Sequence, residues 1–399
     1  IFVWHLLCFN RVLFGARFYI PWDRQDPVKI VAHNRGFGRH GRHILVLFQL
    51  TVDLFLGLFA QLGFRNARFK FGQFAFAVLA LAQPGDNELD RQAQLDVRLG
   101  RLSAELSRQL LEKAGVAANE IQAIGSHGQT VRHAPDAPFP YTVQIGDPNT
   151  IAQPSGVTTV ADFRRRDMSV GGQGDPLVPA FHQALFGDDK KNRVTPNIGG
   201  IANISILPAD PSQAVIGFDT GPGNNLMDAW IAKIQGKTFD YNGDYARTGK
   251  VDNELLSQCL SDDYFKSAPP KSTGFEQFNL DWLMPKIEAG KKLSEADVQA
   301  TLCELTAQSI AEDVNKYAQS IKRLLACGGG AHNAYLMERL QLALPKCIVE
   351  STENYGVKPD WVEAMAFAWL ARQHAHNMAG NLPAVTGAKE AVVLGKATR

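Results

Sequence analysis

The stretch Ile216-Gly217-Phe218-Asp219-Thr220-Gly221-Pro222-Gly223-Asn224 decides the fold of this chain. An apolar run enters it, one acid follows, and a turn of Gly and Pro leads to apolar residues at helical spacing as far as Gly236. This order predicts Asp219 at the carboxyl end of a strand, facing the free N–H groups of a helix N-terminus. Such a carboxylate suits a general base in phosphoryl transfer. A capped helix behind an ordinary turn fits equally well, so both interpretations stay open.

Two more glycine-rich segments accompany strand-like runs. Residues 197–203 predict a hairpin with Gly199 and Gly200 at its turn. Residues 324–333 predict a strand, three successive glycines and a helix with Asn333 as its N-cap. Glycines let a ligand approach the backbone closely. One such loop is weak evidence of a ligand site, but three of them with Asp219 among them are considerably stronger.

Polar residues gather at three other places. The segment 125–130, Gly-Ser-His-Gly-Gln-Thr, follows a short strand, where side chains of α/β proteins tend to line a site. Three arginines lie between Asp162 and Asp167, ahead of a glycine-rich loop, and form either a solvated face or a grip on an anionic substrate. Glu363 begins the last long helix, about 361–378, where the helix dipole favours an acid in any case.

Composition excludes several classes of protein. The net charge of +1 over 399 residues argues against a dedicated nucleic-acid binder. The five cysteines are scattered and form no Cys-x-x-Cys pair, so we expect neither a disulfide framework nor a zinc site, and a reduced, cytoplasmic setting. Residues 44–64 are apolar enough to resemble a membrane span, but Asp53 near the centre would be costly in a bilayer, so we expect no membrane anchor.

The first eighty residues differ from the rest of the chain. They hold ten Lys or Arg against three Asp and no Glu, over half of all Phe, and no Met, and the chain opens on Ile1. Residues 1–81 show no reliable alternation of strand and helix. The character changes near Gln83, after which leucines from Leu95 to Leu110 recur at three- and four-residue spacing and predict an amphipathic helix ending near Gly115.

Taken together, residues from about 82 to 396 resemble the bacterial anhydro-N-acetylmuramic acid kinase family. The resemblance rests on these ordered motifs: Ser126-His127-Gly128-Gln129-Thr130, Asp162-Phe163-Arg164-Arg165-Arg166-Asp167, Asn197-Ile198-Gly199-Gly200, the stretch 217–224, Pro270-Lys271-Ser272-Thr273-Gly274, Cys327-Gly328-Gly329-Gly330 and Asn381-Leu382-Pro383-Ala384-Val385-Thr386-Gly387.

The resemblance implies an α/β protein with the two-lobed sugar kinase/Hsp70/actin-like fold, ribonuclease-H-like sheets and a central nucleotide cleft. We expect residues 82–155 with 386–399 to complete the first lobe and 156–385 to form the second. The family implies ATP and Mg²⁺ as cofactors, a small sugar substrate, a homodimer, and a role in peptidoglycan recycling. In its reaction, water opens the 1,6-anhydro ring while O6 takes the γ-phosphoryl group, giving N-acetylmuramic acid 6-phosphate and ADP.

The resemblance also assigns residues to roles. Asp219 matches the catalytic acid that activates water, in agreement with the local pattern. Substrate-binding residues are Glu363, His127, Gln129, Arg164 and Asp167. Nucleotide-side residues are Asn197, Gly199, Gly200, Gly221, Gly223, Asn224, Gly328, Gly329 and Gly330. The ligands of the magnesium ion stay unidentified.

One departure leaves an alternative open. Members of the family begin with a Gly-Thr-Ser-x-Asp-Gly phosphate loop, and residues 1–81 stand in its place without it. An artificial or out-of-frame start would explain this, and we then expect poor MgATP binding and proteolytic removal of this segment. The alternative is therefore an impaired relative that binds sugar or a partner. A third interpretation, an acetate- or polyphosphate-type phosphotransferase of the same fold, conflicts with the motifs at 126–130 and 162–167.

Overall fold

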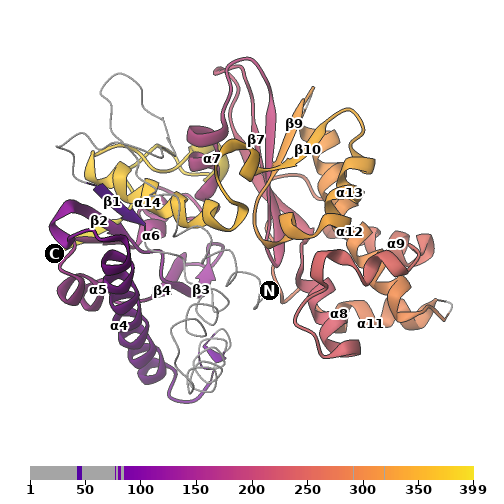
Figure 1. The fold of residues 1–399 in the computed structure, drawn as a ribbon, viewed down its shortest axis with the longest axis horizontal. Helices are drawn as coiled ribbons and strands as arrows, with labels where there is room; N and C mark the ends of the chain where they lie inside the picture. Colours follow the sequence, from indigo (N-terminus) through magenta and orange to yellow (C-terminus); the bar gives the residue numbers. More distant parts are fainter. Residues whose placement is uncertain (1–42, 47–76, 78–79, 82–84, 291, 319) are drawn as a thin grey trace. The chain divides into compact units, whose positions relative to one another are not determined.

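The computed structural model describes residues 43–46, 77, 80–81, 85–290, 292–318 and 320–399 (Figure 1). The chain divides into two compact units: unit 1 comprises residues 1–181 and Glu363–Arg399, and unit 2 comprises His182–Val362. Each unit combines helices with a sheet of its own, so the predicted α/β class is confirmed.

The sheet of unit 1 is mostly parallel. Its strand order is β1-β2-β5-β11, with β1 and β5 parallel to β2 and with β11 antiparallel to β5. A separate antiparallel hairpin joins β3 to β4. The strands are β1 (His43–Val46), β2 (Ile121–Gly125), β3 (Gln129–Ala134), β4 (Tyr141–Ile145), β5 (Thr159–Ala161) and β11 (Lys396–Thr398). The segment that sequence patterns left without strands therefore contributes β1.

The leucine pattern after residue 86 forms the predicted helix α4 (Glu88–Ala114), which ends at Gly115 in the left-handed conformation. It packs on α5 (Pro148–Ser155), as Figure 1 shows. The two helices approach closely because residue 100 is glycine: a Cβ there would lie only 1.9 Å from Oγ1 of Thr150. The other helices of this unit among the described residues are α6 (Phe163–Ser169), α15 (Pro383–Thr386) and most of α14 (Val362–Ala375), while α7 (Val178–Phe186) crosses the unit boundary.

The boundaries between the units differ from the predicted ones at 155/156 and 385/386. Strand β5 pairs with both β2 and β11, so the chain beyond residue 155 still belongs to the sheet of unit 1. Phe367 and Leu370 of α14 pack with Val160 and Leu394 in the same core. Burial of these apolar side chains draws residues from 363 onward into unit 1.

Unit 2 contains a five-stranded sheet in the order β10-β9-β6-β7-β8. Strands β6, β7 and β8 form an antiparallel meander, and β9 and β10 continue the sheet in parallel on the other side of β6. This is the ribonuclease-H-like order that the resemblance implies. The strands are β6 (Arg193–Ile198), β7 (Ile201–Leu207), β8 (Ile216–Pro222), β9 (Arg323–Ala326) and β10 (Ile348–Ser351).

Helix α12 (Glu295–Tyr317) forms the centre of the unit 2 core, and most of its residues from Val298 to Val314 are buried. It contacts α8, α9 and α13 (Figure 1). The remaining helices are α8 (Asn225–Gln235), α9 (Asn253–Leu260), α10 (Asp263–Lys266), α11 (Leu280–Ala289) and α13 (Ala334–Ala343). Short 3₁₀ turns occur at Ala118–Glu120, Tyr241–Gly243, Ala246–Thr248, Gly329–His332, Thr352–Tyr355 and Pro359–Trp361.

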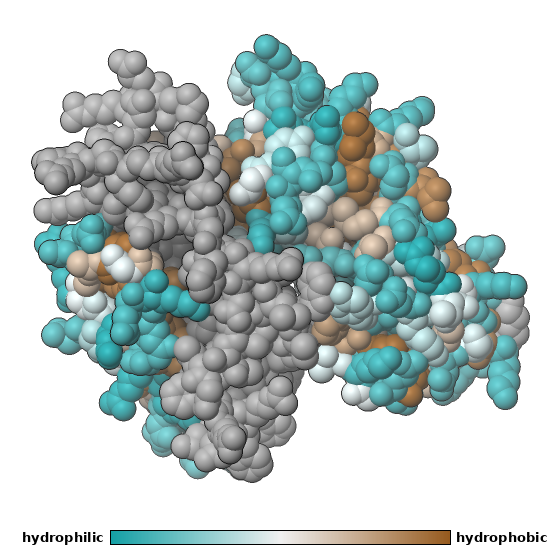
Figure 2. Space-filling model, in the orientation of Figure 1, coloured by the Kyte–Doolittle hydropathy of each residue, from teal (hydrophilic) through white to brown (hydrophobic). Residues whose placement is uncertain are grey.

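The described surface in Figure 2 is largely hydrophilic, with hydrophobic residues in small groups. Within the ranges that the structure describes, we find no helix long and apolar enough to cross a bilayer. Most of the apolar stretch 44–64 lies outside the described residues.

Candidate active site

Asp219 lies inside strand β8, whereas the sequence pattern predicted it at the strand end. The strand continues to Pro222 because Gly221 still pairs with Ala202 of β7. Asp219 itself pairs with Asn203, so Thr220 is an extra residue between two consecutive pairs. An extra residue of this kind forms a β-bulge, which bends the strand and redirects the neighbouring side chains. The bulge therefore sets the direction of the Asp219 carboxylate.

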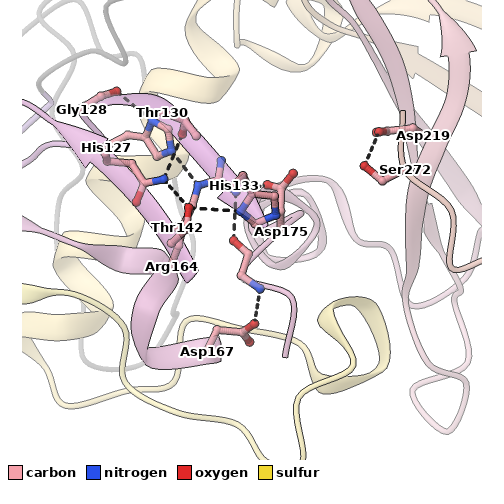
Figure 3. A network of polar contacts seen from close by, with 12 residues as sticks. His127, Gly128, Thr130, His133, Thr142, Arg164, Asp167, Asp175, Asp219 and Ser272 are labelled. Atoms are coloured by element: carbon pink, nitrogen blue, oxygen red, sulfur yellow. Dashed lines mark hydrogen bonds and ion pairs between the residues drawn. The ribbon is translucent and has the colours of Figure 1, made fainter. Parts of the chain in front are cut away.

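A loop at 271–273 holds Asp219 by its carboxylate and its backbone. Figure 3 shows the contact between Ser272 and the carboxylate. Oδ2 of Asp219 accepts hydrogen bonds from Oγ of Ser272 at 3.1 Å and from the backbone N–H of Thr273 at 3.0 Å. The backbone N–H of Asp219 donates to the carbonyl of Lys271 at 3.2 Å. Tyr264 donates its hydroxyl to the carbonyl of Asp219 at 2.8 Å, and burial together with the charge of Asp219 raises the pKa of this phenol. Asp219 is thus fixed from several sides.

Several N–H groups at the start of helix α8, where the sequence pattern predicted free ones, are hydrogen-bonded within the protein. The N–H groups of Gly223 and Asn225 donate to the carbonyl of Gly200, and that of Asn224 donates to the carbonyl of Gly199. Gly223 permits this contact, since a Cβ there would lie 2.4 Å from the Gly199 oxygen. The hairpin turn therefore caps the helix, as unpaired helix N–H groups require.

The three glycine loops of unit 2 converge. The hairpin turn between β6 and β7 is the predicted one, and Nδ2 of Asn224 donates to the carbonyl of Ile198 at 3.0 Å. A Cβ at Gly328 would lie 2.6 Å from Oδ1 of Asn197, and one at Gly330 would lie 2.3 Å from Cγ2 of Ile198. At Gly329 a Cβ would meet only Nδ2 of Asn224, at 3.7 Å. Gly328 and Gly330 are therefore required by packing, whereas Gly329 is not.

In unit 1, Arg164 of helix α6 joins a second polar cluster (Figure 3). Its Nε donates to Nε2 of His127 at 2.9 Å, and its Nη1 donates to the carbonyl of Gly174 at 3.0 Å and pairs with the carboxylate of Asp175. Nδ1 of His127 lies 2.9 Å from the carbonyl of Gly128, which fixes the proton on Nδ1. Burial and the Arg164 charge hold the pKa of His127 well below its usual range, so this ring is neutral.

Asp167 is fully buried and lies three residues after Arg164 on the same helix. Its Oδ2 accepts the N–H of Gly174 at 2.8 Å, and its Oδ1 accepts Nδ2 of Asn381 and Oγ1 of Thr386, both at 2.7 Å. These contacts join the 162–167 and 381–387 motifs and fix the loop that carries Asp175. Gln129 begins strand β3, and its Nε2 donates to the neighbouring carbonyl of Thr130 at 3.2 Å.

Glu363 lies in the first turn of α14 and is half-buried. Burial raises the pKa of its carboxyl to about 7, against an opposing effect of Arg164 and with a further increase from Asp175. The carboxyl is therefore partly protonated near neutral pH and belongs electrostatically to the Arg164 cluster. Such a group either donates or accepts a proton within the physiological range.

This pKa predicts how stability depends on pH. Between about pH 4.5 and 7 the folded chain keeps the Glu363 proton that the unfolded chain has released. The unfolding free energy therefore falls as the pH rises through this range. Glu363→Gln removes the effect. Relative to wild type, we expect the variant to gain roughly 1–3 kcal/mol in unfolding free energy on going from pH 4.5 to pH 8. Urea denaturation at both pH values measures it, with exposed Glu112→Gln as the control; an equal response of both variants would contradict the assignment.

Sequence reasoning assigned no individual role to Ser272, Thr273, Tyr264 or Asp175. The 270–274 segment was recognised as a motif, and that is the signal that could have pointed to the first two. Tyr264 and Asp175 carry no local signal, since their partners lie 45 and 11 residues away in sequence. Among the described residues, no group of three or more His, Cys, Asp or Glu side chains is arranged to hold a metal ion.

An α/β chain with a ribonuclease-H-like sheet and converging glycine loops has the architecture of the sugar kinase/Hsp70/actin class. A family model described as anhydro-N-acetylmuramic acid kinase matches residues 72–399. The chain belongs to this family. The match begins ten residues before the predicted start at 82 and leaves the preceding segment unmatched, as predicted.

Curated relatives agree with this membership. The chain is 51% identical over 318 residues to the anhydro-N-acetylmuramic acid kinase of Coxiella burnetii (strain RSA 493 / Nine Mile phase I), covering 80% of this chain and 85% of that protein. It is 52% identical over 315 residues to the enzyme of the same name from Shewanella amazonensis, covering 79% and 85%.

Two solved structures are distant neighbours. The activator of the 2-hydroxyisocaproyl-CoA dehydratase from Clostridium difficile has a TM-score of 0.36 at 13% identity, covering 67% of this chain and 80% of that chain. A ROK family glucokinase from Streptomyces griseus has a TM-score of 0.29 at 11% identity, covering 67% and 88%.

Proposed function

We propose that this chain is an ATP-dependent kinase that opens the 1,6-anhydro ring of anhydro-N-acetylmuramic acid with water and phosphorylates O6. The products are N-acetylmuramic acid 6-phosphate and ADP. The observation that carries the proposal is the family match over residues 72–399, which includes both polar clusters and all three glycine loops.

Asp219 is the general base of this reaction. Water attacks C1 of the sugar and gives its proton to the Asp219 carboxylate, while the bond between C1 and O6 breaks. O6 then bonds to the γ-phosphorus of ATP, and the bond between that phosphorus and the β,γ-bridging oxygen breaks to release ADP. The two hydrogen bonds to Oδ2 from Ser272 and Thr273 hold the carboxylate in one orientation, which a positioned base requires.

The Arg164 cluster serves the sugar. The substrate carries a lactyl carboxylate, and a guanidinium held by His127 and Asp175 presents a fixed positive charge to such an anion. Glu363, with a pKa near neutrality, is the acidic group on this side. Asp167 acts through the loop at 174–175, since both of its oxygens accept internal hydrogen bonds. Gln129 is the further sugar-side residue.

MgATP is the second substrate, and the glycine loops of unit 2 are its binding segments. Mg²⁺ commonly keeps waters and is held by substrate phosphates with one or two carboxylates, so it enters with the nucleotide. Asn197, Gly199, Gly200, Gly221, Gly223, Asn224 and Gly328–Gly330 form the segments that approach it.

Gly329 offers a test of nucleotide binding that packing does not confound. A methyl group fits there in ordinary contact with Asn224, so Gly329→Ala is expected to keep the melting temperature but raise KM for ATP about tenfold, with KM for the sugar unchanged. Gly330→Ala is the comparison, because its Cβ would collide with Ile198 and destabilise the fold. Equal effects of Gly329→Ala on both substrates would count against a nucleotide role.

Product analysis tests the reaction itself. Purified chain is incubated with MgATP and anhydro-N-acetylmuramic acid in ¹⁸O-labelled water, and mass spectrometry locates the label. The proposal expects the label on C1 of the sugar 6-phosphate. Label in inorganic phosphate instead would indicate plain ATP hydrolysis.

The impaired-relative alternative depends on residues 1–81, most of which lie outside the described residues. The family match through both clusters does not favour it. We further propose that the part of residues 1–81 that precedes the family match at residue 72 stands in place of the first strands and phosphate loop of the family. The DNA upstream of codon 82, read in all frames, tests this, and a phosphate loop in another frame would support it. A homodimer in the cytoplasm, acting in peptidoglycan recycling without nucleic-acid or membrane partners, completes the proposal; light scattering of the purified chain tests the dimer.

A further inference from the structure

A buried ion pair in unit 2 joins Lys271, from the loop that holds Asp219, to Asp313. Nζ of Lys271 is 3.0 Å from Oδ2 of Asp313 on helix α12 and donates to Oδ1 at 3.4 Å. The two side chains are 4% and 7% exposed. Burial raises the pKa of Asp313, while the hydrogen bond from Lys271 and its charge act in the opposite direction.

Stability alone does not explain such a pair. Moving two charges out of water costs about as much as their attraction returns, and apolar residues of similar size often stabilise a protein equally well. The pair does fix where Lys271 lies, because α12 is the most buried helix of the unit. A fixed Lys271 fixes its backbone and the residues that follow it.

Those residues are the ones that hold Asp219. The carbonyl of Lys271 accepts a hydrogen bond from the N–H of Asp219. Ser272 and Thr273 both donate to Oδ2 of Asp219. The ammonium group also lies 5.6 Å from the ring centroid of Phe218, the neighbour of Asp219, and 5.1 Å from that of Tyr264, which donates to the Asp219 carbonyl. The Lys271 ammonium group therefore lies near two aromatic rings, one next to Asp219 in sequence and one hydrogen-bonded to its backbone.

We propose that Lys271, anchored by Asp313, is a positioning residue for the reaction: it orients the Asp219 carboxylate through residues 271–273, whose backbone and Ser272 hydroxyl hydrogen-bond to Asp219. This inference rests on the proposed function, in which Asp219 is the base. Lys271 acts through Asp219 and needs no contact with either substrate. A base turned away from its water loses rate, while substrate affinity is kept.

Two variants separate positioning from stability. Lys271→Met leaves Asp313 buried without its cation and is expected to lower Tm strongly. Lys271→Met with Asp313→Leu removes both charges and is expected to regain the wild-type Tm, yet its kcat should stay at least tenfold low with both KM values within twofold. Recovery of kcat together with Tm would show a merely structural pair and overturn the proposal.

Ser272→Ala tests the same route without touching the buried pair. It removes one donor to Oδ2 and is expected to lower kcat at least tenfold without changing either KM. Ser267→Ala, an exposed hydroxyl that donates to the carbonyl of Asp263, is the matched control. Wild-type kcat in Ser272→Ala would overturn the proposal whatever the buried-pair variants do.

A measurement without turnover keeps this inference separate from the proposed function. In chain labelled with ¹⁵N-threonine, the Thr273 amide proton donates to Oδ2 of Asp219. Its resonance is expected to move upfield in the double variant as that hydrogen bond lengthens, and an unchanged resonance would overturn the proposal. A responsive amide in a chain that phosphorylates no anhydrosugar would refute the proposed function while the orientation of Asp219 by Lys271 stands.

Discussion

Asp219→Asn is expected to lower kcat by about 10²–10⁴-fold while leaving KM for both substrates within twofold. Positioned general bases contribute about this much. The amide preserves the shape of the side chain and accepts hydrogen bonds at one oxygen, but it cannot take the proton of the attacking water. Steady-state kinetics with anhydro-N-acetylmuramic acid and MgATP measure the effect.

Asp263→Asn is the matched control for that experiment. Asp263 is 96% exposed and pairs with Lys266 on the short helix α10, so its replacement should leave kcat unchanged. Near-normal turnover by Asp219→Asn would refute the assignment of the base. A large rise in either KM with normal kcat would move Asp219 from catalysis to binding.

Arg164→Met is the second change with a large expected effect. It removes the charge proposed to face the sugar and leaves His127 and Asp175 without their shared donor. Hydrogen bonds to charged groups contribute about 1.5–3 kcal/mol each, so we expect kcat/KM for the sugar to fall about 10²-fold while KM for ATP stays within twofold.

Arg165 offers an unusually close control for this variant. It is the next residue of the same helix, its side chain is 67% exposed, and it pairs with Asp162 at the helix start. Arg165→Met should therefore leave sugar kinetics near wild type. Similar losses in the two variants, or a matching loss of ATP affinity in Arg164→Met, would contradict the sugar-side role.

Residue spacing located the elements of the fold but not the details of the site. The leucine pattern predicted α4, Asn333 caps α13 as expected, and the paired glycines form the β6–β7 turn. Asp219 could be selected because a lone acid before a glycine-rich turn is a local pattern. The β-bulge at Thr220 could not, since it arises from pairing with β7 in three dimensions.

The same limit applies to the unit boundaries and to the roles of charged residues. The resemblance placed the boundaries at 155/156 and 385/386, whereas the compact units of the structure follow the pairing of β5 with β2 and β11. Arg164 and Asp167 belong to the same motif, yet both oxygens of Asp167 accept internal hydrogen bonds. Oδ2 accepts one from Gly174, and Oδ1 accepts from Asn381 and Thr386, which lie more than 200 residues away. Their different roles follow from their different burial, since Asp167 is fully buried and the Arg164 side chain is 14% exposed. Burial depends on the complete fold and cannot be read from the motif.

The interrupted course of unit 1 has a consequence for biosynthesis. Unit 2 is one continuous segment, so it can fold on the ribosome once its own residues have emerged. Unit 1 must wait, because α14, β11 and the Asn381 and Thr386 partners of Asp167 are translated after unit 2. Until then Asp167 lacks the Asn381 and Thr386 donors, so we expect unit 2 to become native before the 381–387 segment is joined to Asp167.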